Sequence, residues 1–80
     1  MFEIIGIEIV DYLSKKTNRQ VVGKKFYAYR PIASSRGDGY ETEVFFCSDR
    51  MSAYSIVSIG DTVRPIYNKY GNLDDLIVEK

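Results

Sequence analysis

The sequence predicts an all-β domain, a small five-stranded OB-fold-like barrel with a short turn or helix between its third and fourth strands. A chain of 80 residues corresponds to one domain, residues 1–80. Strand-favouring residues form five runs that are separated by glycine, proline and polar turns. No stretch has the apolar period of a long amphipathic helix. An SH3-like barrel is the alternative, and it favours shorter early strands and a long connection after the first strand.

The first strand is expected over residues 2–13, which are rich in Ile and Val. Gly6 interrupts this run, and glycine inside a strand commonly marks a bulge or a sharp bend. Apolar residues occur on both faces, as with Ile4 and Ile5, which suits a strand that contributes to two sheets. A polar turn over residues 14–19 should follow.

The second strand is expected over residues 20–30, and Pro31 ends it. Side chains of a strand alternate between its two faces. One face of this strand would carry Val22, Phe26 and Ala28, and the other would carry Lys25, Tyr27 and Tyr29. A flexible loop over residues 31–39 leads to the third strand.

The third strand is expected over residues 40–47, with Val44 and Phe46 on one face and Glu41, Glu43 and Phe45 on the other. The strand ends at Cys47, which we expect to be a small buried hydrophobe.

The last third of the chain predicts a helical turn and two further strands. Ser48 and Asp49 are candidate caps for a turn over residues 50–54. Gly60 and Asp61 form a turn into the fourth strand, residues 62–67, where Pro65 requires an edge or a bulge. A hairpin loop over residues 68–72 then joins the fifth strand, residues 73–78.

Composition excludes most enzyme classes. The chain has no His and one Cys, which removes the commonest general base, Cys-His pairs and cysteine-rich zinc sites. Asp74 and Asp75 are adjacent strand residues that point to opposite faces, so we expect solvated carboxylates rather than a metal site. An enzyme would have to use a carboxylate pair such as Glu41 and Glu43. We therefore expect a protein that is not an enzyme and has no cofactor.

The cellular setting follows from the same features. One Cys cannot form an internal disulfide, and the N-terminus lacks the basic start and apolar stretch of a signal peptide. No apolar run is long enough to cross a membrane. These observations predict a protein of the reducing cytoplasm.

Charge is divided unevenly along the chain, although the 11 basic and 11 acidic residues balance. Residues 14–36 contain seven basic side chains and no acid, whereas all the acids lie elsewhere. A neutral surface usually intersperses the two signs. The basic segment therefore predicts a contact with an anionic partner, unless Glu41 and Glu43 lie beside Lys24 and Lys25 and neutralise them. The alternative interpretation of this basic segment is a solvated hairpin that maintains solubility.

An OB fold binds its ligands on the face of its second and third strands and with its first and last hairpin loops. The chain places basic and aromatic residues at these positions, and such mixtures bind single-stranded nucleic acid. The candidate phosphate contacts are Lys15, Lys16, Arg19, Lys25, Arg36 and Lys69, and the candidate stacking residues are Tyr27, Tyr29 and Tyr70. For the tyrosines, the alternative is that they cover the barrel and pair across strands.

Three segments also carry a resemblance to a known family. They are the turn around Lys16 that leads into Val22-Gly23, the run Ile59-Gly60-Asp61-Thr62-Val63, and residues 67–73. In length, strand order and aromatic-basic hairpins the chain resembles the small OB-fold single-stranded DNA-binding proteins of filamentous phages and related mobile elements. The resemblance implies a symmetric homodimer that coats single-stranded DNA during replication.

The expected function is thus binding of single-stranded DNA or RNA without strong sequence preference. The competing hypothesis is a β-barrel that docks a protein partner through the same aromatic face, because Tyr and Arg are also enriched in protein interfaces.

Overall fold

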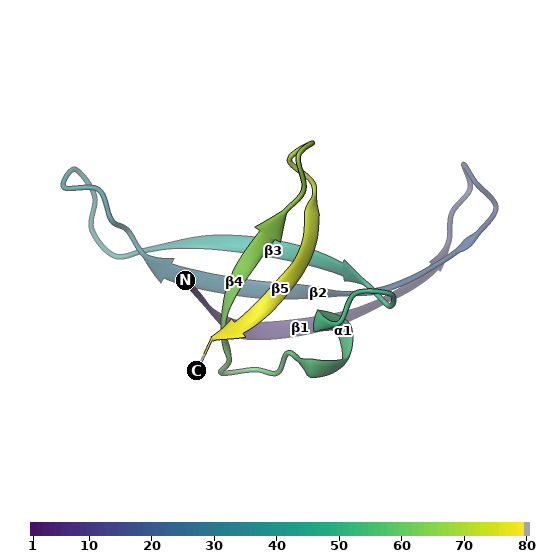
Figure 1. The fold of residues 1–80 in the computed structure, drawn as a ribbon, viewed down its shortest axis with the longest axis horizontal. Helices are drawn as coiled ribbons and strands as arrows, with labels where there is room; N and C mark the ends of the chain where they lie inside the picture. The colour runs from purple at the N-terminus through teal and green to yellow at the C-terminus, as the bar shows by residue number, and fades with distance from the viewer. Residues whose placement is uncertain (80) are drawn as a thin grey trace.

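The computed structural model describes residues 1–79 and contains five antiparallel strands and one short helix (Figure 1). The elements are β1 (Phe2–Leu13), β2 (Gln20–Pro31), β3 (Tyr40–Ser48), α1 (Ala53–Ile56), β4 (Thr62–Tyr67) and β5 (Leu73–Glu79). They form one sheet in the order β3-β2-β1-β4-β5. The predicted all-β class, with five strands and a helical turn between the third and fourth, is confirmed.

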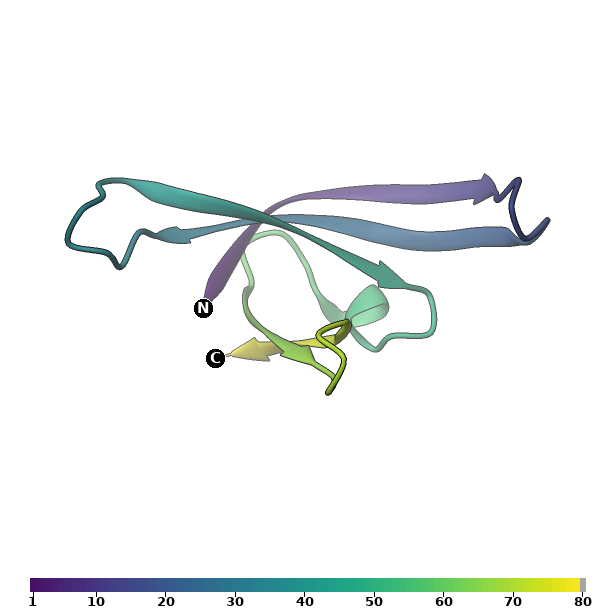
Figure 2. The same cartoon turned by 90° about the horizontal axis from the view of Figure 1, so that it is seen from above.

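β1 belongs to two parts of the molecule because it bends. It pairs with β2 along its whole length, whereas its register with β4 covers only Phe2 and Glu3. The β1–β2 register shifts between Ile4 and Gly6, so the predicted bulge is present at Gly6. As a result β4, β5 and α1 lie on one side of the three long strands (Figure 2).

The strands curl around a core, as the OB-type prediction requires. The outer strands of the sheet, β3 and β5, contact each other without forming a hydrogen-bonded ladder in the part of the chain that the structure describes. β1 and β2 have 12 residues each, and only a short turn joins them. These lengths agree with the OB-like barrel better than with the shorter early strands of the SH3-like alternative.

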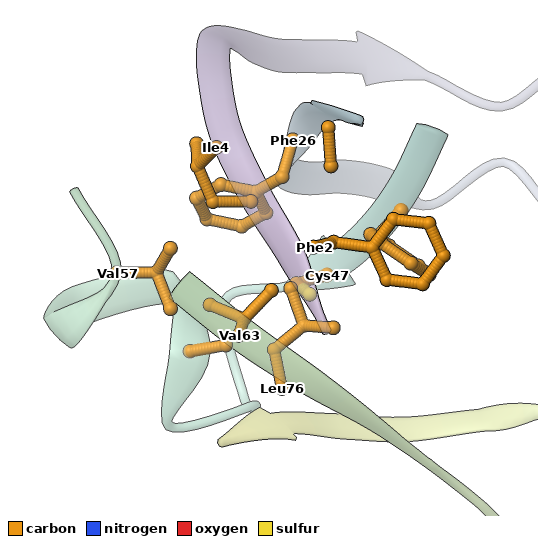
Figure 3. Packing of buried hydrophobic residues seen from close by; sticks show 10 residues of the cluster. Phe2, Ile4, Phe26, Cys47, Val57, Val63 and Leu76 are labelled. Atoms are coloured by element: carbon orange, nitrogen blue, oxygen red, sulfur yellow. The ribbon is translucent and has the colours of Figure 1, made fainter. Parts of the chain in front are cut away.

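The core is apolar and draws on every element (Figure 3). Its buried residues are Phe2, Ile4, Phe26, Ala28, Phe45, Cys47, Ala53, Val57, Val63 and Leu76. The rings of Phe2 and Phe45 meet edge to face, with centroids 5.2 Å apart, and the Arg30 guanidinium lies 4.6 Å from the Phe2 centroid. Cys47 is fully buried, as predicted, and burial raises the pKa of its thiol to about 11.

Pro65 lies at a free strand edge, as the sequence predicted. Its Cα partner is Leu76 of β5, whereas the pairing of β4 with β1 ends at Val63. β4 is therefore free on its other edge at this point, and the missing proline N–H breaks no bond to β1.

The short helix differs from the prediction in its start and its cap. α1 begins at Ala53 rather than Arg50, and neither Ser48 nor Asp49 caps it. Asp75 of β5 holds the first turn of the helix in place. Its carboxylate accepts a hydrogen bond from the Ser52 hydroxyl and another, of 3.1 Å, from the Ala53 N–H. The expectation of a solvated carboxylate is thus wrong for Asp75. Sequence alone could not place β5 beside the helix.

Candidate nucleic-acid interface

The three long strands have one face that no other described element covers. Phe26, Ala28 and Phe45 point into the core, so the alternate residues point to the opposite side, which we call the outer face. It consists of Glu3, Glu8, Val10 and Tyr12 of β1, of Val21, Gly23, Lys25, Tyr27 and Tyr29 of β2, and of Tyr40, Thr42, Val44 and Phe46 of β3. The outer face is therefore rich in aromatic and aliphatic side chains.

Two tyrosines of the outer face are held by acids of β1. The Tyr27 hydroxyl donates a hydrogen bond of 3.1 Å to Glu8, and the Tyr29 hydroxyl donates one of 3.3 Å to Glu3. The hydrogen bond to Glu8 raises the pKa of Tyr27, and the charge of Glu3 raises the pKa of Tyr29. These acids make the N-terminal part of the outer face less suited to phosphate.

A groove of about 450 Å³ lies at the other end of the outer face, beside the β1–β2 turn. It is lined by Thr17, Arg19, Gln20, Val21, Val22, Phe46, Ser48, Asp49 and Arg50. Arg19 of the turn, Arg50 after β3 and the aromatic ring of Phe46 all line this groove. Such a combination of cations and an aromatic ring suits phosphate contact and base stacking together.

Gly23 allows the Phe46 ring to lie where it does. A Cβ atom at Gly23 would stand 2.6 Å from Cζ of Phe46 and 2.7 Å from the carbonyl oxygen of Cys47. The ring therefore rests over the glycine, and 39% of Phe46 remains exposed. An aromatic side chain supported from below and open to solvent is a platform for stacking.

The predicted site residues are divided among four places. Lys15, Lys16 and Arg19 belong to the β1–β2 turn, and Lys25 lies on the outer face between Glu8 and Phe46. Tyr27 and Tyr29 follow on the same face. Arg36 lies in the β2–β3 loop, at the opposite end of the long axis of 46 Å (Figure 1).

Lys69 and Tyr70 form the fourth group, in the β4–β5 hairpin on the core side of the three long strands (Figure 2). The Lys69 ammonium lies 5.1 Å from the centroid of the exposed Tyr70 ring. These two residues share no surface with the outer face, so the structure does not bring them to Tyr27 and Tyr29.

The alternative in which Glu41 and Glu43 lie beside Lys24 and Lys25 and neutralise them does not occur. Glu41 is paired with Arg30 in an ion pair, and Glu43 stands opposite Ala28. Lys25 stands opposite Glu8 instead.

Lys24 points to the core side of the sheet. Its ammonium donates a hydrogen bond of 2.8 Å to the Tyr54 carbonyl and lies 4.4 Å from the centroid of the Tyr54 ring. Lys24 therefore fastens the helix to β2 and takes no part in the outer face.

Sequence reasoning missed Phe46 and Arg50. Alternation placed Phe46 opposite Phe45 but did not say which of the two faced solvent. The expected burial of Cys47 would have predicted the exposed ring. Cys47 and Phe45 share a face of the strand, so Phe46 must point outward. Arg50 follows the end of β3, and strand alternation does not predict where such a residue lies.

Comparison with protein-family models, with curated proteins and with solved structures found no match to this chain. Among residues 1–79, no group of three or more His, Cys, Asp or Glu side chains could hold a metal ion. No helix in this part of the chain has the length and apolar character needed to cross a membrane.

Proposed function

We propose that this protein binds single-stranded nucleic acid without strong sequence preference, through the half of the outer face that adjoins the β1–β2 turn. We call this half the hairpin site, and it comprises Lys15, Lys16, Arg19, Lys25, Phe46 and Arg50. The observation that carries the proposal is the groove that Arg19, Arg50 and the exposed residue Phe46 line together. The cations would follow the phosphates while the ring stacks on a base.

The local charge supports this half of the outer face over the other. The β1–β2 turn contains three cations and no acid, and Asp49 is the one acid that lines the groove. Glu3 lies in the far half beside Tyr29, whereas Glu8, which accepts a hydrogen bond from Tyr27 and stands opposite Lys25, lies between the two halves. The resemblance to small phage and mobile-element proteins favours DNA over RNA, and a role in replication.

Fluorescence anisotropy of labelled oligo(dT) tests the proposal. An oligonucleotide of about 16 nucleotides covers the largest site of one OB fold. We expect binding that weakens with salt and that exceeds binding to a duplex of equal length. Phe46→Ala should weaken binding roughly five- to 150-fold, since one stacked base contributes about 1–3 kcal/mol.

Tyr70→Ala is the matched control, because Tyr70 is an exposed aromatic residue outside the hairpin site. It should bind as tightly as the unmodified protein, and circular dichroism should show that both variants are folded. The proposal is wrong if the protein does not bind oligo(dT) at low salt, or if the two variants bind equally well.

A protein-docking function is supported by a different observation. The far half of the outer face has a second groove of about 260 Å³, lined by Met1, Glu3, Tyr29, Pro31, Tyr40 and Thr62. The rings of Tyr29 and Tyr40 meet edge to face there, with centroids 5.1 Å apart. Aromatic rings beside a carboxylate suit a cationic peptide side chain. Tyr40→Ala would reduce such docking and leave oligo(dT) binding unchanged.

A further inference from the structure

β1 has a long edge that no described strand covers. Its pairing with β4 is limited to Phe2 and Glu3, and Ile4 adds backbone hydrogen bonds of 2.9 Å to Asp61 and 2.8 Å to Gly60. Among residues 1–79, no strand pairs with this edge from Ile5 to Leu13, although β2 pairs with the opposite edge throughout. Nine residues of a continuous strand are thus open on one side.

The direction of the backbone groups on this edge follows from two hydrogen bonds. The Ser14 N–H donates to Arg19, so Ser14 faces β2, and the Val22 carbonyl accepts from Asp49, so Val22 faces away from β1. Asp11 is the partner of Val22 and therefore also faces away from β2. By alternation, the N–H and C=O groups of Ile7, Ile9, Asp11 and Leu13 point to the open edge.

Few of the features that usually protect an edge strand are present. Residues 5–13 contain no Pro and no Lys, and the only bulge lies at the start of the segment. Glu8 and Asp11 are the charged residues of the segment, and several apolar side chains are exposed, with 52% of Ile5, 69% of Ile9 and 56% of Leu13 accessible. A long edge with exposed apolar side chains is a template for a further strand.

We propose that a second copy of this chain supplies that strand, so that two β1 edges pair antiparallel about a twofold axis at Ile9. The length of the open segment fixes this register. Ile9 is the midpoint of residues 5–13, and pairing about it uses the whole segment. The pairing ends where Ser14, at the β1–β2 turn of one copy, reaches Ile4 of the other, because the backbone groups of Ile4 already bond Gly60 and Asp61.

The register is self-complementary. It places Ile9 opposite Ile9, Ile7 opposite Asp11, Glu8 opposite Val10, and Gly6 opposite Tyr12, with Ile5 facing Leu13 across the end of the segment. No two like charges stand directly opposite, and a tyrosine covers a glycine. A register shifted to pair Glu8 with itself, or Asp11 with itself, would oppose like charges. The pairing about Ile9 avoids both.

The inference goes beyond the proposed function and does not depend on it. Pairing the edges would join the two sheets through β1 into a continuous sheet of six long strands. A twofold axis normal to that sheet would place both outer faces on the same side, with the two hairpin sites at opposite ends.

Sedimentation velocity without nucleic acid tests the interface. The unmodified protein should form dimers as its concentration rises. Ile9→Lys should weaken dimerisation roughly tenfold or more, because it places like charges opposite each other at the axis. Ile77→Lys is the matched control, since Ile77 is 41% exposed and lies on β5, which pairs with β4 and not with β1, and it should dimerise normally.

Two further results decide the matter. Ile9→Glu alone should likewise weaken dimerisation roughly tenfold or more, whereas a mixture of Ile9→Lys and Ile9→Glu should form a heterodimer, because opposite charges then meet. In the unmodified protein, hydrogen exchange at the Ile7, Ile9 and Leu13 amides should slow as concentration rises. The inference is overturned if the protein stays monomeric up to about 1 mM, if Ile9→Lys dimerises like Ile77→Lys, or if those amides exchange equally fast at all concentrations.

Discussion

At the scale of single residues, Gly23 controls the position of the Phe46 ring. A Cβ at this position would meet both the ring and the Cys47 carbonyl oxygen, at 2.6 and 2.7 Å, and backbone cannot move aside easily. We expect Gly23→Ala to lower the free energy of unfolding by about 1–3 kcal/mol, as measured by denaturant titration. Gly6→Ala is the control, since its nearest contact would be an ordinary 3.5 Å, and it should change stability by about 0.5 kcal/mol or less.

A double substitution separates the two clashes at Gly23. Phe46→Ala in the Gly23→Ala background removes the ring clash but leaves the clash with Cys47, so stability should recover only in part. The coupling energy from this cycle measures the contact between the ring and residue 23. Full stability of Gly23→Ala would contradict the account of the platform.

Residue types predicted the two faces of β2 correctly but not the partners of its side chains. Phe26 and Ala28 are buried and Tyr27 is exposed, as alternation required. Alternation has no information on register, however, and register decides that Glu8 rather than Glu41 faces Lys25. For the same reason the hydrogen bonds from Tyr27 and Tyr29 to acids of β1 were not predictable.

At the scale of elements, Asp75 links β5 to the start of α1. Desolvation acts to raise the pKa of this carboxyl, but the hydrogen bonds from Ser52, Leu76 and Ala53 outweigh it and lower the pKa. We expect Asp75→Ala to lower the free energy of unfolding by about 1–2 kcal/mol, as for a lost helix cap. Asp74→Ala, at the exposed neighbouring position, should have little effect.

The contribution of Asp75 to the free energy of unfolding should depend on pH in one direction. Because its pKa is lower in the folded state than in the unfolded chain, its stabilisation is complete above the unfolded value of about 3.9. It is lost as the pH falls through the folded value. The difference in stability between the unmodified protein and Asp75→Ala, from denaturant titrations at several pH values, should therefore be constant near neutrality and shrink in acid. A difference that grows in acid would contradict this assignment.

The order of the elements was predictable from sequence, but their directions in space were not. Gly6 predicted the bulge because glycine frees the local backbone, and Pro65 predicted an edge because proline lacks the N–H of a strand ladder. The three loops that carry predicted cations, in contrast, point to different parts of the molecule (Figure 1). Their separation depends on how far β1 and β2 extend beyond the core, and no local pattern determines this.

At the scale of the whole molecule, positive charge is placed at separate ends of a long body. β2 has 12 residues, so at about 3.3 Å per residue the turn at Arg19 and the loop at Arg36 are roughly 40 Å apart. A short oligonucleotide bound at the hairpin site would contact the cations of one end only. Which cations contribute to binding is then visible in the salt dependence of affinity.

Two double substitutions with equal changes in net charge test this division. Four to five phosphate contacts at the hairpin site predict that log K falls with log salt with a slope of roughly −3, from about −0.7 per contact for a single strand. Lys15→Ala with Lys16→Ala should make the slope shallower by roughly 1.4, in anisotropy titrations over a range of salt. Arg36→Ala with Lys69→Ala also removes two positive charges, but both lie outside the hairpin site, so the slope should not change. If both pairs changed the slope equally, the oligonucleotide would be responding to the charge of the whole protein, and the hairpin site would lose its support.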